Sequence, residues 1–315
     1  MSPFQLETPV AFIIFNRPDN TLKVFEAIRQ AQPPILLVAA DGPRVDRIGE
    51  AEKCAETRAI IDRVDWSCEV LTNYSEINLG MKLREASAFD WVFDTVEEAI
   101  ILEDDCLPNP TFFQYCEELL NYYRHDPRIM TISGDNTPPG YTKKRRSNDS
   151  YYFSIYHRTW GWATWRRAWK HYDIKMQQWP QIRDENWLRD VLHDPATVKH
   201  WEKTFQSAFD GFNTWDYQWM FACWLQGGLS IIPNGNLITN LGFNREGTNT
   251  TDSGDPRANV PTQAMQFPMQ HPSMVIPDRQ ADEFSKRQLY MPHFPYRVRR
   301  KARKTLNKIM ESSAN

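Results

Sequence analysis

The sequence of 315 residues is poor in the features that mark disulfide-stabilised, zinc-binding and membrane-spanning proteins. Its five cysteines are scattered, odd in number and without CxxC spacing, which argues against a disulfide framework or a zinc site and favours a reducing compartment. No apolar run approaches the roughly 18 residues of a membrane span, and the N-terminus lacks a basic region followed by an apolar core. We therefore expect a cytoplasmic protein without a signal peptide. The cysteines are residues 54, 68, 106, 116 and 223.

The sequence also lacks the two common glycine-rich phosphate-binding motifs. Neither GxGxxG nor GxxxxGK[ST] occurs, so a standard dinucleotide-binding fold and a P-loop are both excluded. The net charge is unevenly distributed along the chain. Seven Lys or Arg and one Glu follow residue 296 and give this tail a charge of +6, which leaves −9 for the rest of a chain whose total is −3. A general nucleic-acid binder is therefore not expected.

The most informative stretch is a short apolar run that ends in three acids. Residues 99–102 read Ala-Ile-Ile-Leu, which predicts a strand buried on both faces of a parallel sheet. Glu103, Asp104 and Asp105 follow directly, at the sheet edge where open α/β folds bind ligands. Their mutual repulsion is relieved by a divalent cation carrying a diphosphate, because Mg²⁺ is usually held by one or two carboxylates plus substrate phosphates.

The alternative interpretation of these acids is a solvated acidic turn that caps the next helix. Asn109 and Pro110 already supply an N-cap and a first helical residue for the segment that begins at Thr111. The acids are therefore not needed as a cap, which favours ligand binding.

Strands and helices are predicted to alternate along the first half of the chain, which indicates an α/β fold with a doubly wound, mostly parallel sheet. From residue 151 to residue 224 the sequence is aromatic and is predicted to be helical, and residues 138–150 and 233–277 are predicted to be loops. The expected strands are 9–15, 35–40, 68–72, 99–103 and 129–133, and the expected helices are 20–30, 49–63, 78–95, 111–120 and 214–226.

The acidic motif and its surroundings resemble the GT-A class of nucleotide-sugar glycosyltransferases. The likeness is greatest to the N-acetylglucosaminyltransferase that acts on high-mannose N-glycans and to uncharacterised bacterial relatives. There too a Glu-Asp-Asp motif precedes a proline-containing turn and a Phe-Phe helix, matched by Phe112 and Phe113. The resemblance covers residues 9–136 well and the Trp-rich part more loosely. It implies a Rossmann-like GT-A domain with a donor-binding half (1–136) and a Trp-rich helical acceptor-binding and catalytic half (137–277). The resemblance does not cover residues 278–315, which are predicted to be a basic tail.

The resemblance also implies roles on the donor side. Glu103 and Asp104 would bind ribose, and Asp105 would hold Mn²⁺ or Mg²⁺. Arg17 matches an arginine that contacts the donor phosphates, and its planar guanidinium suits phosphate oxygens. Asp41 matches an aspartate that reads uracil, and Lys82 falls where the family has a histidine that helps to hold the donor. The simpler alternatives are an exposed loop residue for Arg17, an Asp-Gly turn for Asp41 and a surface lysine for Lys82.

On the acceptor side, Asp216 matches the family's catalytic base in a Trp-Asp segment before a helix. An aspartate in a first helical turn is also favoured by the helix dipole alone. Trp160 and Trp215 are predicted to contact the acceptor, with Trp160 stacked on a sugar ring. Trp162, Trp165 and Trp169 have i, i+3, i+7 spacing, which predicts one packed face of a helix. Residues 244–249 would form either a lid over the donor or an ordinary surface loop.

Together these features predict a metal-dependent inverting glycosyltransferase that moves a sugar from a UDP-sugar to a glycan or glycolipid acceptor in envelope polysaccharide synthesis. The basic tail would attach it peripherally to the inner face of an anionic membrane, or would be a disordered soluble tail. Two alternatives stay open. One is a non-catalytic carbohydrate- or nucleotide-sugar-binding protein. The other is a sugar nucleotidyltransferase, although its expected Gly-rich, Lys-containing N-terminal loop is absent. No nucleic-acid partner is expected, because no aromatic platform accompanies the basic charge.

Overall fold

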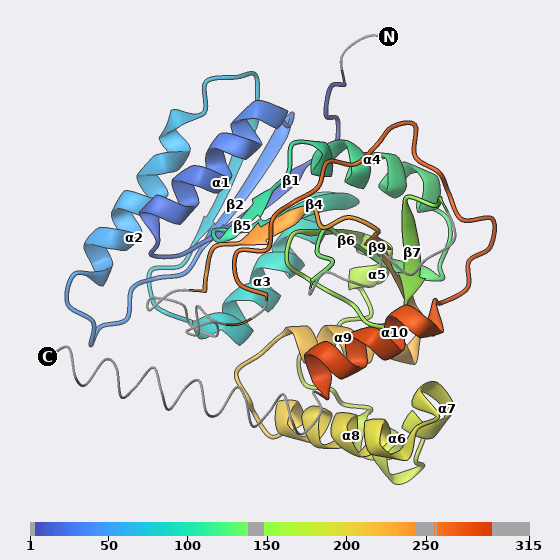
Figure 1. The fold of residues 1–315 in the computed structure, drawn as a ribbon. Helices are drawn as coiled ribbons and strands as arrows, with labels where there is room; N and C mark the ends of the chain where they lie inside the picture. Colours follow the sequence, from blue (N-terminus) through green and yellow to red (C-terminus); the bar gives the residue numbers. More distant parts are fainter. Residues whose placement is uncertain (1–3, 138–147, 244–254, 256, 292–315) are drawn as a thin grey trace, which may run out of the picture.

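The structure is a computed structural model that describes residues 4–137, 148–243, 255 and 257–291. Its centre is a single eight-stranded sheet with strand order β3-β2-β1-β4-β8-β6-β9-β7, flanked by helices (Figure 1). This arrangement confirms the predicted α/β fold class with a mostly parallel sheet. A separate two-stranded sheet pairs β5 (Cys106–Pro108) with β10 (Ile238–Asn240).

The first four strands lie where the sequence predicts them. They are β1 (Val10–Ile14), β2 (Ile35–Ala40), β3 (Glu69–Tyr74) and β4 (Glu98–Glu103), and all of their pairings are parallel. The connecting helices are α1 (Pro18–Ala31), α2 (Glu50–Ala59) with the short 3₁₀ helix η1 (Ile60–Arg63), and α3 (Gly80–Thr95). Parallel pairing brings the carboxyl ends of β1, β2 and β4 to one edge of the sheet.

The other four strands extend the same sheet beyond residue 136. They are β6 (Ile129–Ser133), β7 (Tyr151–Ser154), β8 (Trp162–Trp165) and β9 (Leu229–Pro233). β8 runs antiparallel between β4 and β6, and β7 runs antiparallel to β9, so only these two strands are reversed within the eight-stranded sheet. The predicted donor and acceptor halves therefore share one sheet.

The helical prediction for residues 151–224 is wrong at its start. Residues 151–154 and 162–165 form strands β7 and β8, and the helix that follows, α5, spans only Arg166–Trp169. In a strand, residues three apart point to opposite faces. Trp162 accordingly packs in the cluster beneath α3, whereas Trp165 packs in the cluster beneath α1 and α4. The two tryptophans fit a helical period and a strand equally well, and only the pairing with β4 and β6 distinguishes them.

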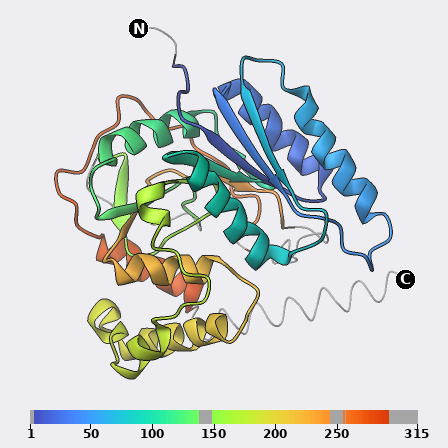
Figure 2. The ribbon, with the colours of Figure 1, turned by 180° about the vertical axis from the view of Figure 1, so that it is seen from behind.

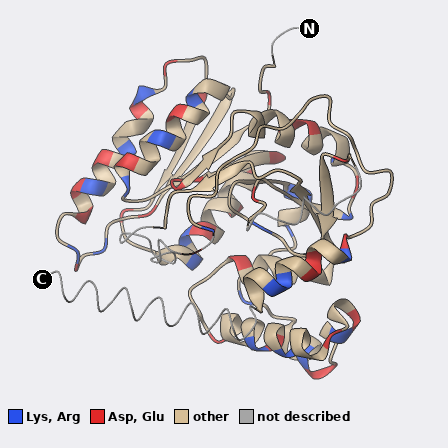
Figure 3. Ribbon diagram, viewed as in Figure 1, with Lys and Arg blue, Asp and Glu red and all other residues tan. Residues whose placement is uncertain are grey.

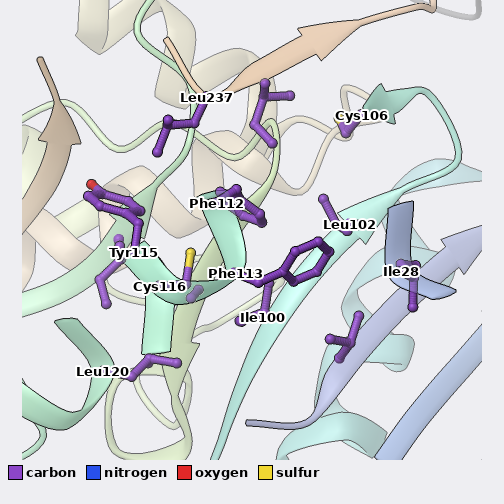
Figure 4. Close-up of a cluster of buried hydrophobic side chains, with 14 of the residues drawn as sticks. Ile28, Ile100, Leu102, Cys106, Phe112, Phe113, Tyr115, Cys116, Leu120 and Leu237 are labelled. Carbon is purple, nitrogen blue, oxygen red and sulfur yellow. The ribbon is translucent and has the colours of Figure 1, made fainter. Parts of the chain in front are cut away.

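Two apolar layers sandwich the sheet. On one face α1 and α4 (Thr111–Tyr123) cover the side chains of alternate strand residues, including Ile100 and Leu102 of β4 (Figure 4). On the other face, seen from behind in Figure 2, α3 packs on Ile101 and its neighbours through Phe89 and Val92. As predicted, Asn109 caps α4, because its Oδ1 accepts the Thr111 N–H at 3.1 Å.

A third apolar cluster joins four helices between residues 179 and 225. It includes residues of α6 (Trp179–Asp184), α7 (Leu188–Leu192), α8 (Pro195–Phe209) and α9 (Asp216–Leu225), with Trp201 and Phe205 at its centre. Asp194 caps α8 by accepting the Thr197 N–H at 3.0 Å. The predicted helix at 214–226 thus exists, and it begins at Asp216.

The basic tail is predicted to begin at residue 278, but the folded part of the chain continues beyond that residue. Residues 279–290 form α10 (Arg279–Ser285) and the π-helical turn η3 (Lys286–Tyr290). α10 packs on β7 and β9 through Ala281, which contacts Tyr152 and Ile232. Both charge signs are interspersed on α10, as they are on α1 and α2 (Figure 3). The basic residues from 297 onward, and the predicted lid at 244–249, lie outside the described residues.

Among the helices in the described ranges, none combines the length and the apolar character that crossing a membrane requires.

Candidate active site at the carboxyl edge of the sheet

A cavity of about 340 Å³ opens where β1, β2 and β4 end. Register pairs Ile13 with Glu103 and Ile14 with Ala40, so the residues that follow the three strands converge on it. Six of the predicted site residues line this cavity, and they come from four separate stretches of the sequence. They are Arg17, Asp41, Glu103, Asp104, Asp105 and Trp160.

Arg17 forms ion pairs with two of the acids at the end of β4. Its guanidinium Nη1 lies 2.5 Å from Asp105 Oδ2 and 3.4 Å from Asp104 Oδ1. Burial disfavours the charged guanidinium, but the fields of Asp104 and Asp105 outweigh it and hold the pKa of Arg17 above its ordinary value. Arg17 therefore stays protonated and offers its remaining N–H groups to the cavity.

Asp104 is fixed by the backbone of the neighbouring strand. The Phe15 N–H donates to Asp104 Oδ2 at 3.2 Å. Burial raises the pKa of Asp104 to about 6, against the opposing field of Arg17. Burial, with the charge of Glu85 next, raises the pKa of the partly buried Glu103 as well. The cavity thus concentrates negative charge in a poorly solvated place.

Asp105 is enclosed by the chain that follows β10. Its carbonyl accepts the Leu241 N–H at 2.7 Å. A Cβ at Gly242 would lie 2.2 Å from Asp105 Oδ2, so any larger residue there would displace the carboxylate or the backbone. The position of Asp105 therefore depends on a segment more than 130 residues away in sequence.

Asp41 lines the cavity, but its carboxylate is already engaged with the protein. Oδ1 accepts the N–H groups of Gly42 and Leu79, each at 2.9 Å, and Oδ2 accepts Gly80 N–H and Asn78 Nδ2, each at 3.0 Å. Four accepted bonds fill the capacity of a carboxylate. Asp41 therefore caps α3 from outside the helix, and its predicted contact with uracil stays a prediction.

The side chain of Lys82 extends to the end of α8 and not to the cavity. Its Nζ lies 3.5 Å from the carbonyl of Ala208 at the end of α8, and its backbone N–H donates to Asn213 Oδ1 at 3.0 Å. Lys82 is absent from the cavity wall formed by the described residues. Lys82 thus connects α3 to the end of α8 and to the segment before α9. Its predicted contact with the donor stays a prediction.

Asp216 occupies the first position of α9, and its Oδ1 accepts a hydrogen bond from Thr214 Oγ1. Burial raises the pKa of Asp216, partly offset by that hydrogen bond. Asp216 does not line the cavity as the described residues form it, but Asn213 of the same segment does. Its role as a base stays a prediction.

Trp215 is a correction to the predicted site. Its side chain is only 4% exposed, and its ring packs against Phe89 at 4.8 Å and against Trp162 at 5.6 Å between centroids. A ring enclosed in this way belongs to the core beneath α3 and cannot stack on a sugar that enters from solvent. Trp215 precedes Asp216 in the sequence, but its ring lies in the apolar core and not at the surface.

Trp160, by contrast, is partly buried and forms part of the cavity wall. Its ring meets Phe243 edge-on with centroids 5.6 Å apart, and the guanidinium carbon of Arg257 lies 5.6 Å from its ring centroid. This indole can therefore meet a ligand in the cavity, and its stacking on an acceptor sugar stays a prediction.

The sequence analysis missed Arg84 and Glu85, which line the same cavity from α3. Glu85 precedes Phe89 by one helical turn and thus lies on the apolar stripe that packs on the sheet. A charged residue on an otherwise apolar stripe was the available signal. Burial, with Asp104 the next cause, raises the pKa of Glu85 to about 8.

The charges of the cavity fit a divalent cation carried by a diphosphate. Five carboxylates and three arginines line it, so the wall carries a formal charge of −2 when all are ionised. Within the described ranges, no three acid, His or Cys side chains are arranged to hold an ion by themselves. Any metal there would take most of its ligands from a substrate, which is the usual arrangement for Mg²⁺.

Comparison with known proteins adds little to this description. No protein-family model matches the chain, and no curated protein matches it. Among solved structures, a UDP-glucose pyrophosphorylase in complex with UDP-glucose matches at 10% identity and a TM-score of 0.26, over 49% of this chain and 64% of that chain. Mouse xyloside xylosyltransferase 1 matches at 12% identity and a TM-score of 0.31, over 68% of this chain and 81% of that chain.

The chain thus spans less than two thirds of the pyrophosphorylase it matches. At these identities and TM-scores neither likeness assigns a family or an activity to the chain.

Proposed function

We propose that the protein is a metal-dependent, inverting glycosyltransferase that uses a UDP-sugar. The observation that carries the proposal is the meeting of Arg17 with Asp104 and Asp105 in one cavity at the carboxyl edge of a mostly parallel sheet. This is the edge at which open α/β sheets bind ligands. A buried arginine beside several carboxylates can hold a phosphate–metal pair, because it supplies donors to the phosphate while the acids attract the cation.

The donor would lie along this edge. Arg17 contacts the diphosphate, Glu103 and Asp104 accept hydrogen bonds from ribose hydroxyls, and Asp41 and its α3 cap lie at the uracil end. Lys82 is not needed in this arrangement. Asp105 would hold Mn²⁺ or Mg²⁺, and the bound metal supplies positive charge that stabilises the departing diphosphate.

The acceptor would enter beside Trp160. Asp216 is the proposed general base, because inverting transfer requires a carboxylate that removes the acceptor hydroxyl proton during attack on the anomeric carbon. The raised pKa of Asp216 suits a base, since a more basic carboxylate takes up a proton more readily. A glycan or glycolipid of an envelope polysaccharide is the proposed acceptor.

A thermal-shift screen of UDP-, GDP- and dTDP-sugars, each with and without Mn²⁺, tests the proposal. A ligand at a hundredfold excess over its Kd stabilises a protein by about 2.7 kcal/mol, which raises the melting temperature by several degrees. We expect UDP compounds to do so only with Mn²⁺. Equal shifts without metal, or shifts with none of the nucleotides, would contradict the proposal.

Transfer to acceptors then separates the transferase from the alternatives. A binding protein would show metal-dependent UDP-sugar binding but no hydrolysis or transfer, and a nucleotidyltransferase would release pyrophosphate from UTP and a sugar 1-phosphate.

A further inference from the structure

Glu85 is a buried carboxylate without a protein partner inside the cavity. It is 9% exposed, and its Oε2 atom has no hydrogen-bond partner among the described residues. It extends from the second turn of α3 and lines the cavity with Glu103, Asp104 and Asp105. Leaving a buried carboxylate oxygen unpaired costs free energy. Such an atom in a cavity is therefore a candidate contact for a ligand.

The nearby cations are directed elsewhere. Arg17 pairs with Asp105 and Asp104. The adjacent Arg84 donates from Nη2 to the carbonyl and side-chain oxygens of Asn73, at 2.6 and 3.1 Å. Arg44 pairs with Glu50. The Glu85 carboxylate therefore keeps its acceptor capacity for a ligand that brings its own hydrogen-bond donors.

The position of Glu85 indicates which part of a ligand it meets. The first turn of α3 touches the segment before α9, through the Lys82 N–H and Asn213 Oδ1. Glu85 shares the cavity wall with Arg17 and with Asn213, which lies three residues before Asp216. A ligand in this cavity that contacts Arg17 through its diphosphate can therefore reach Glu85 with the sugar that the diphosphate carries.

We infer that Glu85 accepts hydrogen bonds from hydroxyl groups of the sugar that is transferred, and so helps to select the donor sugar. The inference rests on the proposed function. A carboxylate accepts from one or two hydroxyls and cannot donate to them while ionised. A site built to hydrogen-bond a hydroxyl discriminates strongly against an analogue that lacks it, because the buried group is then left unpaired.

The test compares the wild type with Glu85→Gln and Glu85→Ala by calorimetry in Mn²⁺. The probes are UDP, UDP-glucose, UDP-galactose and UDP-N-acetylglucosamine, and monodeoxy analogues of whichever sugar nucleotide binds most tightly. We expect both variants to bind UDP within about twofold of the wild type. We expect Glu85→Ala to lose about tenfold or more in affinity for the preferred UDP-sugar, the usual cost of leaving a buried hydrogen-bonding group unpaired. Glu85→Gln keeps one acceptor oxygen and should lose less.

The analogues give the sharper result. One monodeoxy donor should bind the wild type and Glu85→Ala equally, because the variant and the analogue remove the same hydrogen bond. Asp94→Asn is the matched control, since it removes one exposed carboxylate from the same helix. Its affinities should equal those of the wild type. The melting temperature of Glu85→Gln should not fall, because glutamine keeps the size of the side chain and Glu85 Oε2 has no hydrogen bond to lose among the described residues.

Three outcomes would overturn the inference. Loss of Mn²⁺-dependent UDP binding in Glu85→Gln would make Glu85 a metal ligand. If the variants bind every UDP-sugar with the affinity of the wild type, and if each monodeoxy donor loses as much affinity for the variants as for the wild type, Glu85 has no part in sugar recognition. The proposed function would then be unaffected. Failure of the wild type to bind any UDP compound would refute the proposed function and, with it, this inference.

Discussion

At the scale of single residues, Asp105 is the carboxylate on which metal binding depends. We predict that Asp105→Ala abolishes Mn²⁺-dependent UDP binding and leaves the fold intact, because Arg17 keeps Asp104 as a partner at 3.4 Å. Calorimetry with UDP and Mn²⁺, beside a melting curve, measures both effects. Asp46→Ala is the matched control, since it removes an exposed carboxylate that does not line the cavity. Equally tight metal-dependent binding by Asp105→Ala would contradict the assignment.

A catalytic role and a purely structural role of Asp216 predict different effects of substituting it. Asparagine is nearly isosteric but cannot take up the acceptor proton. We predict that Asp216→Asn keeps donor and metal affinity while kcat falls by roughly 10²–10⁴, the usual contribution of general-base catalysis. A purely structural role at the start of α9 would instead lower stability by about 0.3–1 kcal/mol and leave turnover nearly unchanged. Single-turnover transfer, measured together with a melting curve, decides between the two.

The pH dependence of transfer adds a second readout for Asp216. Burial raises its pKa, and the base works only when ionised, so the rate of transfer should fall on the acid side. The fall should begin at a higher pH than an unperturbed aspartate, with a pKa near 3.9, would give.

Truncation of Trp215 should mainly lower stability, whereas truncation of Trp160 should mainly lower activity. Trp215→Ala would open a cavity in the core and lower the free energy of unfolding by about 3–5 kcal/mol. Trp160→Ala should cost less stability, because its ring is partly exposed in the cavity wall, and should lower transfer to the acceptor. Chemical denaturation and transfer assays on both variants test this. Comparable losses of stability would show that Trp160 is also a core residue.

At the scale of elements, α10 is held to the sheet through a buried acid. Asp282 Oδ1 accepts a hydrogen bond from Ser154 Oγ of β7 at 2.5 Å. Burial raises the pKa of Asp282 to about 7, whereas an aspartate in an unfolded chain titrates near 3.9. Between about pH 4 and pH 7 the folded state binds this proton more tightly than the unfolded state. The contribution of Asp282 to stability is therefore present at low pH and declines as pH rises to 7.

We predict that Asp282→Asn removes this decline. Asparagine Oδ1 can still accept the Ser154 hydroxyl, so the melting temperature of the variant relative to the wild type should rise between pH 5 and pH 8. The slope that is removed is at most about 1.4 kcal/mol per pH unit. The exposed Asp190→Asn serves as control, with a constant difference from the wild type. A constant difference for Asp282→Asn would show that Asp282 is ionised in the fold throughout this range.

At the scale of the whole molecule, the basic tail is predicted to attach the protein to an anionic membrane. Each basic residue near such a surface contributes about 1 kcal/mol, and seven lie beyond residue 296. Deleting residues 297–315 should release the protein from anionic vesicles and spare activity on soluble acceptors. Sedimentation with anionic and with neutral vesicles measures this. An intact protein that ignores anionic vesicles at low salt would refute the prediction.

The sequence by itself determined the first half of the sheet and the edge that carries the acids. Runs such as Ile35–Ala40 are apolar on both faces, and a strand between two helical layers is the arrangement that buries them. Because these strands are parallel, the residues after them converge whatever the rest of the chain does. Glu103, Asp104 and Asp105 could therefore be assigned to a site from local patterns, and the family resemblance added Arg17 to it.

The tertiary structure alone decided the second half of the sheet and the state of individual side chains. Trp162 and Trp165 became strand residues through pairing with β4 and β6. Trp215 became core because α3 covers it. Asp41 became a helix cap, and Glu85 entered the cavity without a partner. Each outcome depends on contacts between residues far apart in sequence, and burial and hydrogen-bond satisfaction are properties of those contacts rather than of local pattern.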